Sequence, residues 1–242
     1  MIRTMGFVGV VIAAVAFFAC AQAIAENDLV GAWDFDEGSG VECVDASVNA
    51  NHARIPKPQY VHWVEGYRGQ AIELSGDEKK SGVAVVRKLR GFDPSKGMTI
   101  EARVKFDKSF VRKDACFIAN MGGWKGPGFR FCVAYNRLVF KSGDGKELWG
   151  AASVAAEHGP FKAGQWYHLA GTYDGSVFRV YVDGAMVGEK AETRGITKDD
   201  PSLSIGSYGG GVTGHIKGAI DELRITNRAR SAEELLTAAR LR

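Results

Sequence analysis

Residues 168–188 read HLAGTYDGSVFRVYVDGAMVG, and this stretch decides the fold class. Two alternating runs, 168–173 and 177–182, flank Asp174-Gly175, and Asp183-Gly184 follows the second run at once. Asp-Gly between alternating apolar residues is typical of a tight β-hairpin, because both central residues of a type I′ turn need a positive φ. The segment therefore predicts an antiparallel meander of three short strands.

Further alternating runs lie on both sides of this meander, at Thr99–Phe106, Phe129–Ala134, Leu138–Phe140 and Leu223–Ile225. Many short strands between glycine-rich turns indicate an all-β sandwich. The 31 glycines of the chain suit the tight turns that such a fold needs. A chain of this length fits one large all-β domain, which we place at residues 26–242.

The first 25 residues have the pattern of a secretory signal peptide. Arg3 supplies a positive charge, Val8–Phe18 is apolar, and small residues such as Ala23-Ile24-Ala25 offer a cleavage site. The apolar stretch is short for a membrane span, so we expect no transmembrane segment. We expect residues 1–25 to be removed and the protein to be secreted, periplasmic or at the cell surface. A lipoprotein signal that ends at Cys20 is the alternative.

The charge pattern argues against nucleic acid as a partner. The formal net charge is +3, and acidic and basic residues are interspersed without a basic stripe. The one short basic cluster is Arg87-Lys88-Leu89-Arg90. We interpret it as the solvated end of a strand.

Three cysteines remain after the signal peptide. Cys116 and Cys132 lie in two runs that a glycine-rich loop connects. If that hairpin is centred on Trp124, the two cysteines lie opposite each other, where a disulfide can form in an oxidising compartment. The alternative is two separate buried thiols. Cys43 has the pattern of a small core residue.

Two pairs of apolar residues and a helix cap predict how the ends of the chain pack. Trp33 and Phe35 share one strand face, as do Leu223 and Ile225, so both strands can contribute to one core. Ser231-Ala232-Glu233-Glu234 has the spacing of a capping box. We therefore expect a short C-terminal helix over about residues 232–240.

A set of sequence blocks occurs in the order of a known family: Leu29–Gly40, Asp45–Ala53, Gly69–Gly76, Met98–Ala102, Gln165–Gly175 and Gly218–Ala229. By these blocks, residues 26–242 resemble the laminin G-like, concanavalin A-like lectin/glucanase domains of bacterial secreted proteins. The resemblance implies a two-sheet antiparallel jelly roll, from about Asp28 to Ala229, whose first and last strands are neighbours. The family includes glycan binders, adhesion modules and passive appendages to enzymes.

No catalytic motif is evident in the sequence. Retaining glucanases of the same architecture carry Glu-x-Asp-x-x-Glu on one strand, because the acid and the nucleophile must lie roughly 5 Å apart. This pattern does not occur here, and neither do Gly-x-Ser-x-Gly, Cys-x-x-Cys or His-Glu-x-x-His. We therefore predict a non-enzyme, with a glycoside hydrolase of unrecognised site as a distant alternative.

A calcium site is the metal hypothesis that the sequence supports. The loop from Asp45 to Asn51 is rich in the oxygen ligands that Ca²⁺ prefers. If the first and last strands are neighbours, Glu37 and Asp221 can converge with this loop, and we place Asp221 on the same strand face as Leu223. The alternative is that Asp45 and Asn51 cap turns and Asp221 accepts hydrogen bonds from backbone amides.

Exposed aromatic residues in loops are the candidates for ligand binding. They are Trp124 among glycines, Tyr208 in a second glycine-rich loop, and Trp149 after Asp144-Gly145. The leading hypothesis is a secreted module that binds a polysaccharide, glycoprotein or cell-surface partner without chemistry. The second is a structural or adhesive domain whose partner is a protein, with strand edges or loops as the contact surface.

Overall fold

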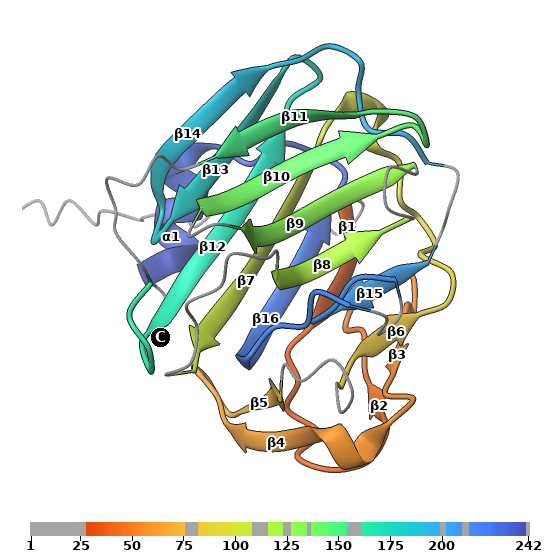
Figure 1. Ribbon diagram of the computed structural model, residues 1–242, viewed down its shortest axis with the longest axis vertical. Helices are drawn as coiled ribbons and strands as arrows, with labels where there is room; N and C mark the ends of the chain where they lie inside the picture. The colour runs from red at the N-terminus through yellow and green to blue at the C-terminus, as the bar shows by residue number, and fades with distance from the viewer. Residues whose placement is uncertain are drawn as a thin grey trace, which may run out of the picture.

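The computed structural model describes residues 28–75, 82–107, 116–122, 127–134, 137–153, 161–198, 202–209 and 213–240. These residues form two antiparallel sheets that pack face to face, with one short helix on the outside (Figure 1). The predicted fold class, a two-sheet antiparallel sandwich with a C-terminal helix, is confirmed. The predicted signal peptide at residues 1–25, including Cys20, lies outside the described residues.

The first sheet has the order β14-β13-β12-β7-β16-β5-β4, and β1 pairs with β16. Its strands are β1 (Leu29–Trp33), β4 (Val61–Glu65), β5 (Gln70–Leu74), β7 (Met98–Phe106), β12 (Trp166–Tyr173), β13 (Val177–Val182), β14 (Ala185–Ala191) and β16 (Gly218–Thr226). The meander of β12, β13 and β14 follows the prediction. Only the second Asp-Gly turn has a positive φ at both residues, 50° at Asp183 and 80° at Gly184.

The second sheet has the order β11-β10-β9-β8-β15-β6-β3-β2. Its strands are β2 (Glu42–Cys43), β3 (Ala53–Arg54), β6 (Ala84–Val86), β8 (Cys116–Met121), β9 (Gly128–Ala134), β10 (Arg137–Gly143), β11 (Leu148–Ser153) and β15 (Leu203–Ile205). Two short 3₁₀ helices, η2 (Pro58–Tyr60) and η3 (Pro94–Lys96), lie in the connections.

One hydrophobic core fills the space between the sheets. Trp33, Phe35, Leu223 and Ile225 are all fully buried in it, as the shared strand faces predict. The first and last strands pair as the resemblance implies, with Trp33 opposite Leu223. The first and last strands of the described chain are therefore neighbours in the same sheet.

The predicted disulfide between Cys116 and Cys132 is wrong. Both residues are buried thiols, as is Cys43. In the pairing of β8 with β9, Cys116 lies opposite Val133 and Cys132 lies opposite Phe117. Side chains alternate between the faces of a sheet, so the one-residue offset sends Cys116 into the core and Cys132 to the outer face. Cys43 is a core residue, as predicted.

Helix α1 (Ala232–Arg240) covers the outer face of the first sheet and has the predicted bounds. Its Leu235 packs against Ala170 and Tyr181. The capping box forms: the Glu234 amide donates to Ser231 Oγ, and the Ser231 amide donates to the Glu234 carboxylate. With nine residues α1 is too short for a bilayer, and the described ranges contain no other helix that could cross one.

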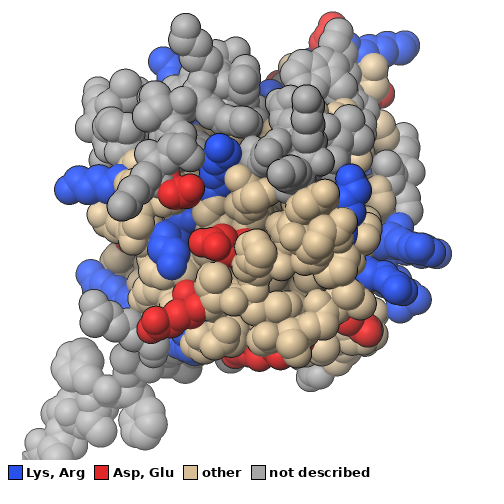
Figure 2. Space-filling model, turned by 60° about the horizontal axis from the view of Figure 1, so that its bottom comes forward, with Lys and Arg blue, Asp and Glu red and all other residues tan. Residues whose placement is uncertain are grey.

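Charged side chains of both signs are spread over the face of the molecule in Figure 2, as the interspersed sequence predicts. Lys and Arg side chains also gather at the right-hand edge of this view, the side on which Figure 1 places β3 and β6. The surface charge is therefore less even than the composition suggests.

Candidate functional site

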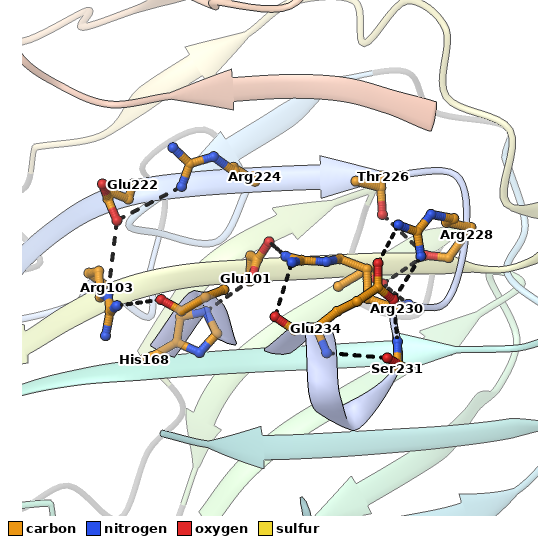
Figure 3. A network of polar contacts seen from close by, with 12 residues as sticks. Glu101, Arg103, His168, Glu222, Arg224, Thr226, Arg228, Arg230, Ser231 and Glu234 are labelled. Atoms are coloured by element: carbon orange, nitrogen blue, oxygen red, sulfur yellow. Dashed lines mark hydrogen bonds and ion pairs between the residues drawn. The ribbon is translucent and has the colours of Figure 1, made fainter. Parts of the chain in front are cut away.

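A network of buried charged side chains lies between the first sheet and α1 (Figure 3). Glu101 on β7 is hydrogen-bonded to His168 Nε2 on β12 at 2.9 Å, and it also accepts a hydrogen bond from Arg230. All three side chains are less than 10% exposed. A carboxylate beside a histidine is a common catalytic pair, so this network must be tested as an active site.

The electrostatics of Glu101 favour a structural role. Burial raises the pKa of its carboxyl, but the hydrogen bond from His168 and the charge of Arg230 outweigh that effect and lower it. Glu101 is therefore an ionised partner for Arg230 and not a proton donor. Because α1 covers the group, a polymeric substrate has no access to it. The network fastens the helix to the sheet.

A second arginine fixes the other end of the helix. Arg103 on β7 donates hydrogen bonds to the carbonyl oxygens of Ala238 and Ala239 at 2.8 and 3.0 Å. A cation at a helix C-terminus is favourable because the last carbonyls carry partial negative charge. The Arg103 guanidinium also lies 3.9 Å from the ring centroid of Tyr67. This part of the face, at β7, β12 and β13, is thus covered by the protein itself.

The outer face of the second sheet carries a small aromatic and apolar cluster. Phe117 on β8, Cys132 on β9 and Val139 on β10 are its buried members, and the partly buried Tyr208 packs against them. The Tyr208 and Phe117 rings lie 5.3 Å apart. Burial raises the pKa of Tyr208, and the nearby Arg130 charge opposes that rise. Tyr208 is therefore an aromatic ring held beside a cation.

A row of paired residues crosses the same outer face from β3 to β10. In order along the row, the Cα partners are Arg54, Val85, Ser204, Asn120, Arg130 and Lys141. The middle of the row is buried, whereas Arg54 is exposed and Lys141 is partly exposed. With about 4.8 Å between strands, Arg54 lies roughly 19 Å from Arg130. The face is polar and has cations at both ends.

No described contact brings the other two predicted ligand-binding residues, Trp124 and Trp149, to this cluster. Trp124 lies outside the described residues. Trp149 is on β11 opposite Ser142, and its side chain is outside what the structure describes. Tyr208 is therefore the predicted aromatic that the structure places, and a binding role for each of the three stays a prediction.

The predicted calcium loop is a hydrogen-bonded turn. Asp45 Oδ1 accepts from the amides of Ala32 and Ser47, and Asp45 Oδ2 accepts from Ser47 Oγ and the Asn51 amide. The Asn51 side chain donates to the carbonyls of Val30 and Arg90 and accepts from the Arg90 amide. These oxygens already have donors, which is the turn-capping alternative.

Glu37 and Asp221 have different hydrogen-bond partners near that loop and away from it. Asp221 accepts hydrogen bonds from the amides of Tyr67, Arg68 and Glu222, and Glu37 accepts one from the Val44 amide. In the described ranges, no three acidic, histidine or cysteine side chains form a group that fits a metal ion. Glu37 thus lies beside the start of the loop, whereas no described contact joins Asp221 to it. A calcium site built from Glu37, Asp45, Asn51 and Asp221 stays a prediction.

The strand face predicted for Asp221 is wrong. Ile220 and Leu223 both lie in the core although they are three residues apart. A bulge in β16 between Asp221 and Arg224, with a φ of 46° at Glu222, breaks the alternation. Asp221 consequently lies opposite Arg103 and bonds to the turn between β4 and β5.

Comparison with known proteins places this geometry in context. The family described as the concanavalin A-like lectin/glucanases superfamily matches residues 77–236. The structure is similar to domain 4 of AbnA, a GH43 extracellular arabinanase from Geobacillus stearothermophilus, in complex with arabinotriose. The TM-score is 0.68 at 19% identity, over 88% of this chain and 98% of that domain. Identity this low shows the fold alone.

Two further similarities cover parts of longer proteins. The binding domain of botulinum neurotoxin DC, in complex with SialylT, gives a TM-score of 0.69 at 10% identity over 89% of this chain and 52% of that one. The same toxin domain has also been solved with rat synaptotagmin II. Among curated proteins, pappalysin-1 of Mus musculus is 32% identical over 85 residues, which is 33% of this chain and 5% of pappalysin-1.

Glu101→Gln tests the structural role of the buried network. The change leaves the buried Arg230 guanidinium without its counter-charge, and we expect the free energy of unfolding to fall by about 3–5 kcal/mol. The matched control is Glu189→Gln, which removes one of the two carboxylate partners of Arg179 in an exposed ion pair and should cost less than about 1 kcal/mol. Urea denaturation measures both. Equal losses in the two variants would contradict the assignment.

Asp221 should make stability depend on pH. Burial raises its pKa from 3.8 to about 6, against the opposing hydrogen bonds from the amides of Arg68 and Glu222. The folded protein therefore keeps the proton to higher pH than the unfolded chain does. The resulting stabilisation is fully present below about pH 4 and is lost as the pH rises through 6, a change of about 3 kcal/mol.

The measurement compares urea unfolding of the wild type and Asp221→Asn across this pH range. Because other groups titrate in the same pH range, the readout is the difference in the free energy of unfolding between the two proteins. We expect that difference to change between pH 4 and pH 7. A constant difference would refute the raised pKa.

The hydrogen bonds of Asp45 and Asp221 also predict the response to calcium. The turn-capping alternative predicts the same melting temperature in millimolar Ca²⁺ and in chelator, because the carboxylate oxygens already accept hydrogen bonds within the protein. A metal bound only by the folded state would instead raise the melting temperature by roughly 5–10 °C at a hundredfold excess over Kd. Such a rise, lost in Asp45→Asn, would establish the site.

Proposed function

This chain belongs to the concanavalin A-like lectin/glucanases superfamily, and on that premise we propose that it is a non-catalytic module that binds carbohydrate. The observation that carries the proposal is the partly buried Tyr208 ring, which packs on Phe117 beside Arg130 at the outer face of the second sheet. Aromatic rings with a few fixed polar groups are typical of sugar-binding surfaces. Helix α1 covers part of the outer face of the first sheet, at β7, β12 and β13, and the proposal places the ligand at the second sheet.

Similar structures support the substrate class. Domain 4 of the arabinanase binds arabinotriose, and the botulinum neurotoxin domain was solved with SialylT. The non-catalytic role is supported by the burial of Glu101 and His168 beneath α1. An extracellular location follows from the signal-like sequence at residues 1–25 and fits an extracellular glycan as the partner.

A protein partner is the second candidate function. The neurotoxin domain was also solved with rat synaptotagmin II. Strand β14 forms one edge of the first sheet, and Met186 on it is 51% exposed. An exposed edge strand can extend its sheet with a strand of a partner. Glu189 and Lys190 on the same strand oppose such pairing unless the partner carries matching charges.

Tyr208→Ala tests the carbohydrate proposal. We expect the affinity for the best ligand of a glycan array, with arabinotriose included, to fall by about tenfold or more, because the ring supplies the stacking surface. Tyr208→Phe keeps the ring and should retain most of the affinity. Isothermal titration measures the change. Trp124→Ala applies the same test to Trp124, the first of the three aromatic residues that the sequence predicts for ligand binding.

Trp166→Ala is the control variant for position 208. Trp166 is a partly exposed aromatic on the first sheet, where Lys105 lies 4.9 Å from its ring centroid. The variant should bind glycans like the wild type. Glycan binding that is lost in Trp166→Ala and kept in Tyr208→Ala would move the site to the first sheet, and silence across the array would favour a protein partner.

A further inference from the structure

A pocket of about 340 Å³ lies at the β3–β6 edge of the second sheet. Its lining includes His52 and Arg54 from one segment and Arg87, Lys88 and Arg90 from another. All five side chains are exposed. The basic cluster that the sequence places at a strand end is therefore one wall of a pocket, and pairing of β3 with β6 brings Arg54 to it.

Hydrogen bonds fix the backbone around the pocket. The Asn51 amide group joins the two walls, because it donates to the Arg90 carbonyl at 2.9 Å and accepts from the Arg90 amide at 2.8 Å. The Asp45 amide donates to His52 Nδ1 at 3.0 Å, so the proton of the neutral ring lies on Nε2. The Arg90 guanidinium donates to the Ala50 carbonyl. The pocket is thus built before any ligand arrives.

Among the residues that the structure describes, no carboxylate compensates the positive charge of the pocket. The described residues that line it include no Asp or Glu. Arg54, Arg87, Lys88 and Arg90 form no ion pair within 4.0 Å with any carboxylate that the structure describes, although Glu42 lies opposite Arg54 across β2 and β3. Asp45, beneath the pocket, is buried and bonded to backbone amides. Four like charges around one concavity attract an anion.

We propose that this pocket binds the carboxylate or sulfate groups of an acidic polysaccharide. The inference rests on the proposed carbohydrate-binding function and names the class of glycan. Arginine offers forked N–H donors that match both anionic groups. Arg54 belongs to the residue row that leads to Arg130 beside Tyr208, so the pocket and the aromatic cluster share one face of the second sheet.

The test compares the double variant Arg54→Gln/Arg87→Gln with the wild type. The probes are polygalacturonate and dextran sulfate as acidic glycans, dextran as a neutral glycan, and duplex DNA as an anion of another class. We expect the wild type to bind an acidic glycan more weakly as salt rises, and the double variant to lose about tenfold or more of that affinity. DNA should bind neither protein at the same concentrations.

The control variant is Lys162→Gln/Lys190→Gln, which removes the same charge from exposed positions outside the pocket. It should keep the wild-type affinity. Equal losses in the two double variants would show an effect of net charge and overturn the proposal, as would unchanged binding in the pocket variant or equally tight binding of DNA. Thermal melting checks that both variants are folded.

The same data separate this inference from the proposed function. If the array yields a neutral ligand that depends on Tyr208 while neither acidic glycan binds, the acidic-glycan inference fails and carbohydrate binding stands. If no glycan of any kind binds the wild type, both fail. Binding of polygalacturonate alone assigns the pocket to carboxylate groups, and binding of dextran sulfate alone assigns it to sulfate groups.

Discussion

The rest of the structure depends on the hydrogen bonding of both edges of strand β1. One edge pairs with β16 and joins the ends of the chain in one sheet. The other edge has side chains where a neighbouring strand is expected: Asp45 accepts from the Ala32 amide, and Asn49 and Asn51 donate to the Val30 carbonyl. Buried backbone groups without partners cost free energy. The loop therefore completes the hydrogen bonding of β1.

This explains the polar composition of the loop without a metal. The Trp33 indole N–H, in the core, donates to the Asn51 carbonyl at 2.9 Å, and the Asn51 side chain holds Arg90. One residue thus connects the core, β1 and the basic pocket. The Asn51 side chain that donates to β1 also joins the two segments that line the pocket, so the backbone of the proposed anion site is held by contacts that also stabilise the fold.

Local and periodic signals predicted most of the fold. Three features follow from a few neighbouring residues, and predicting them did not require the pairing register of the strands. They are the Asp183-Gly184 turn, the Ser231 cap of α1 and the burial of Trp33. Two failures, the cysteine pair and the strand face of Asp221, come from β-bulges. A bulge in β8 accompanies the offset of Cys116 from Cys132, and Glu222 in β16 moves Asp221 off the face of Leu223. The basic pocket was missed because Arg54 and Arg87 are distant in sequence and meet through strand pairing.

The pairing of charges differs between the two sides of the sandwich. Around the first sheet and α1, Arg228, Arg230 and Arg179 each have a carboxylate partner in Glu234, Glu101 and Asp174. At the pocket, no carboxylate that the structure describes forms an ion pair with the arginines. A small net charge of +3 therefore conceals a local excess of positive charge. Because exposed like charges repel, that excess destabilises the free protein slightly, and an anionic ligand converts the same repulsion into binding free energy.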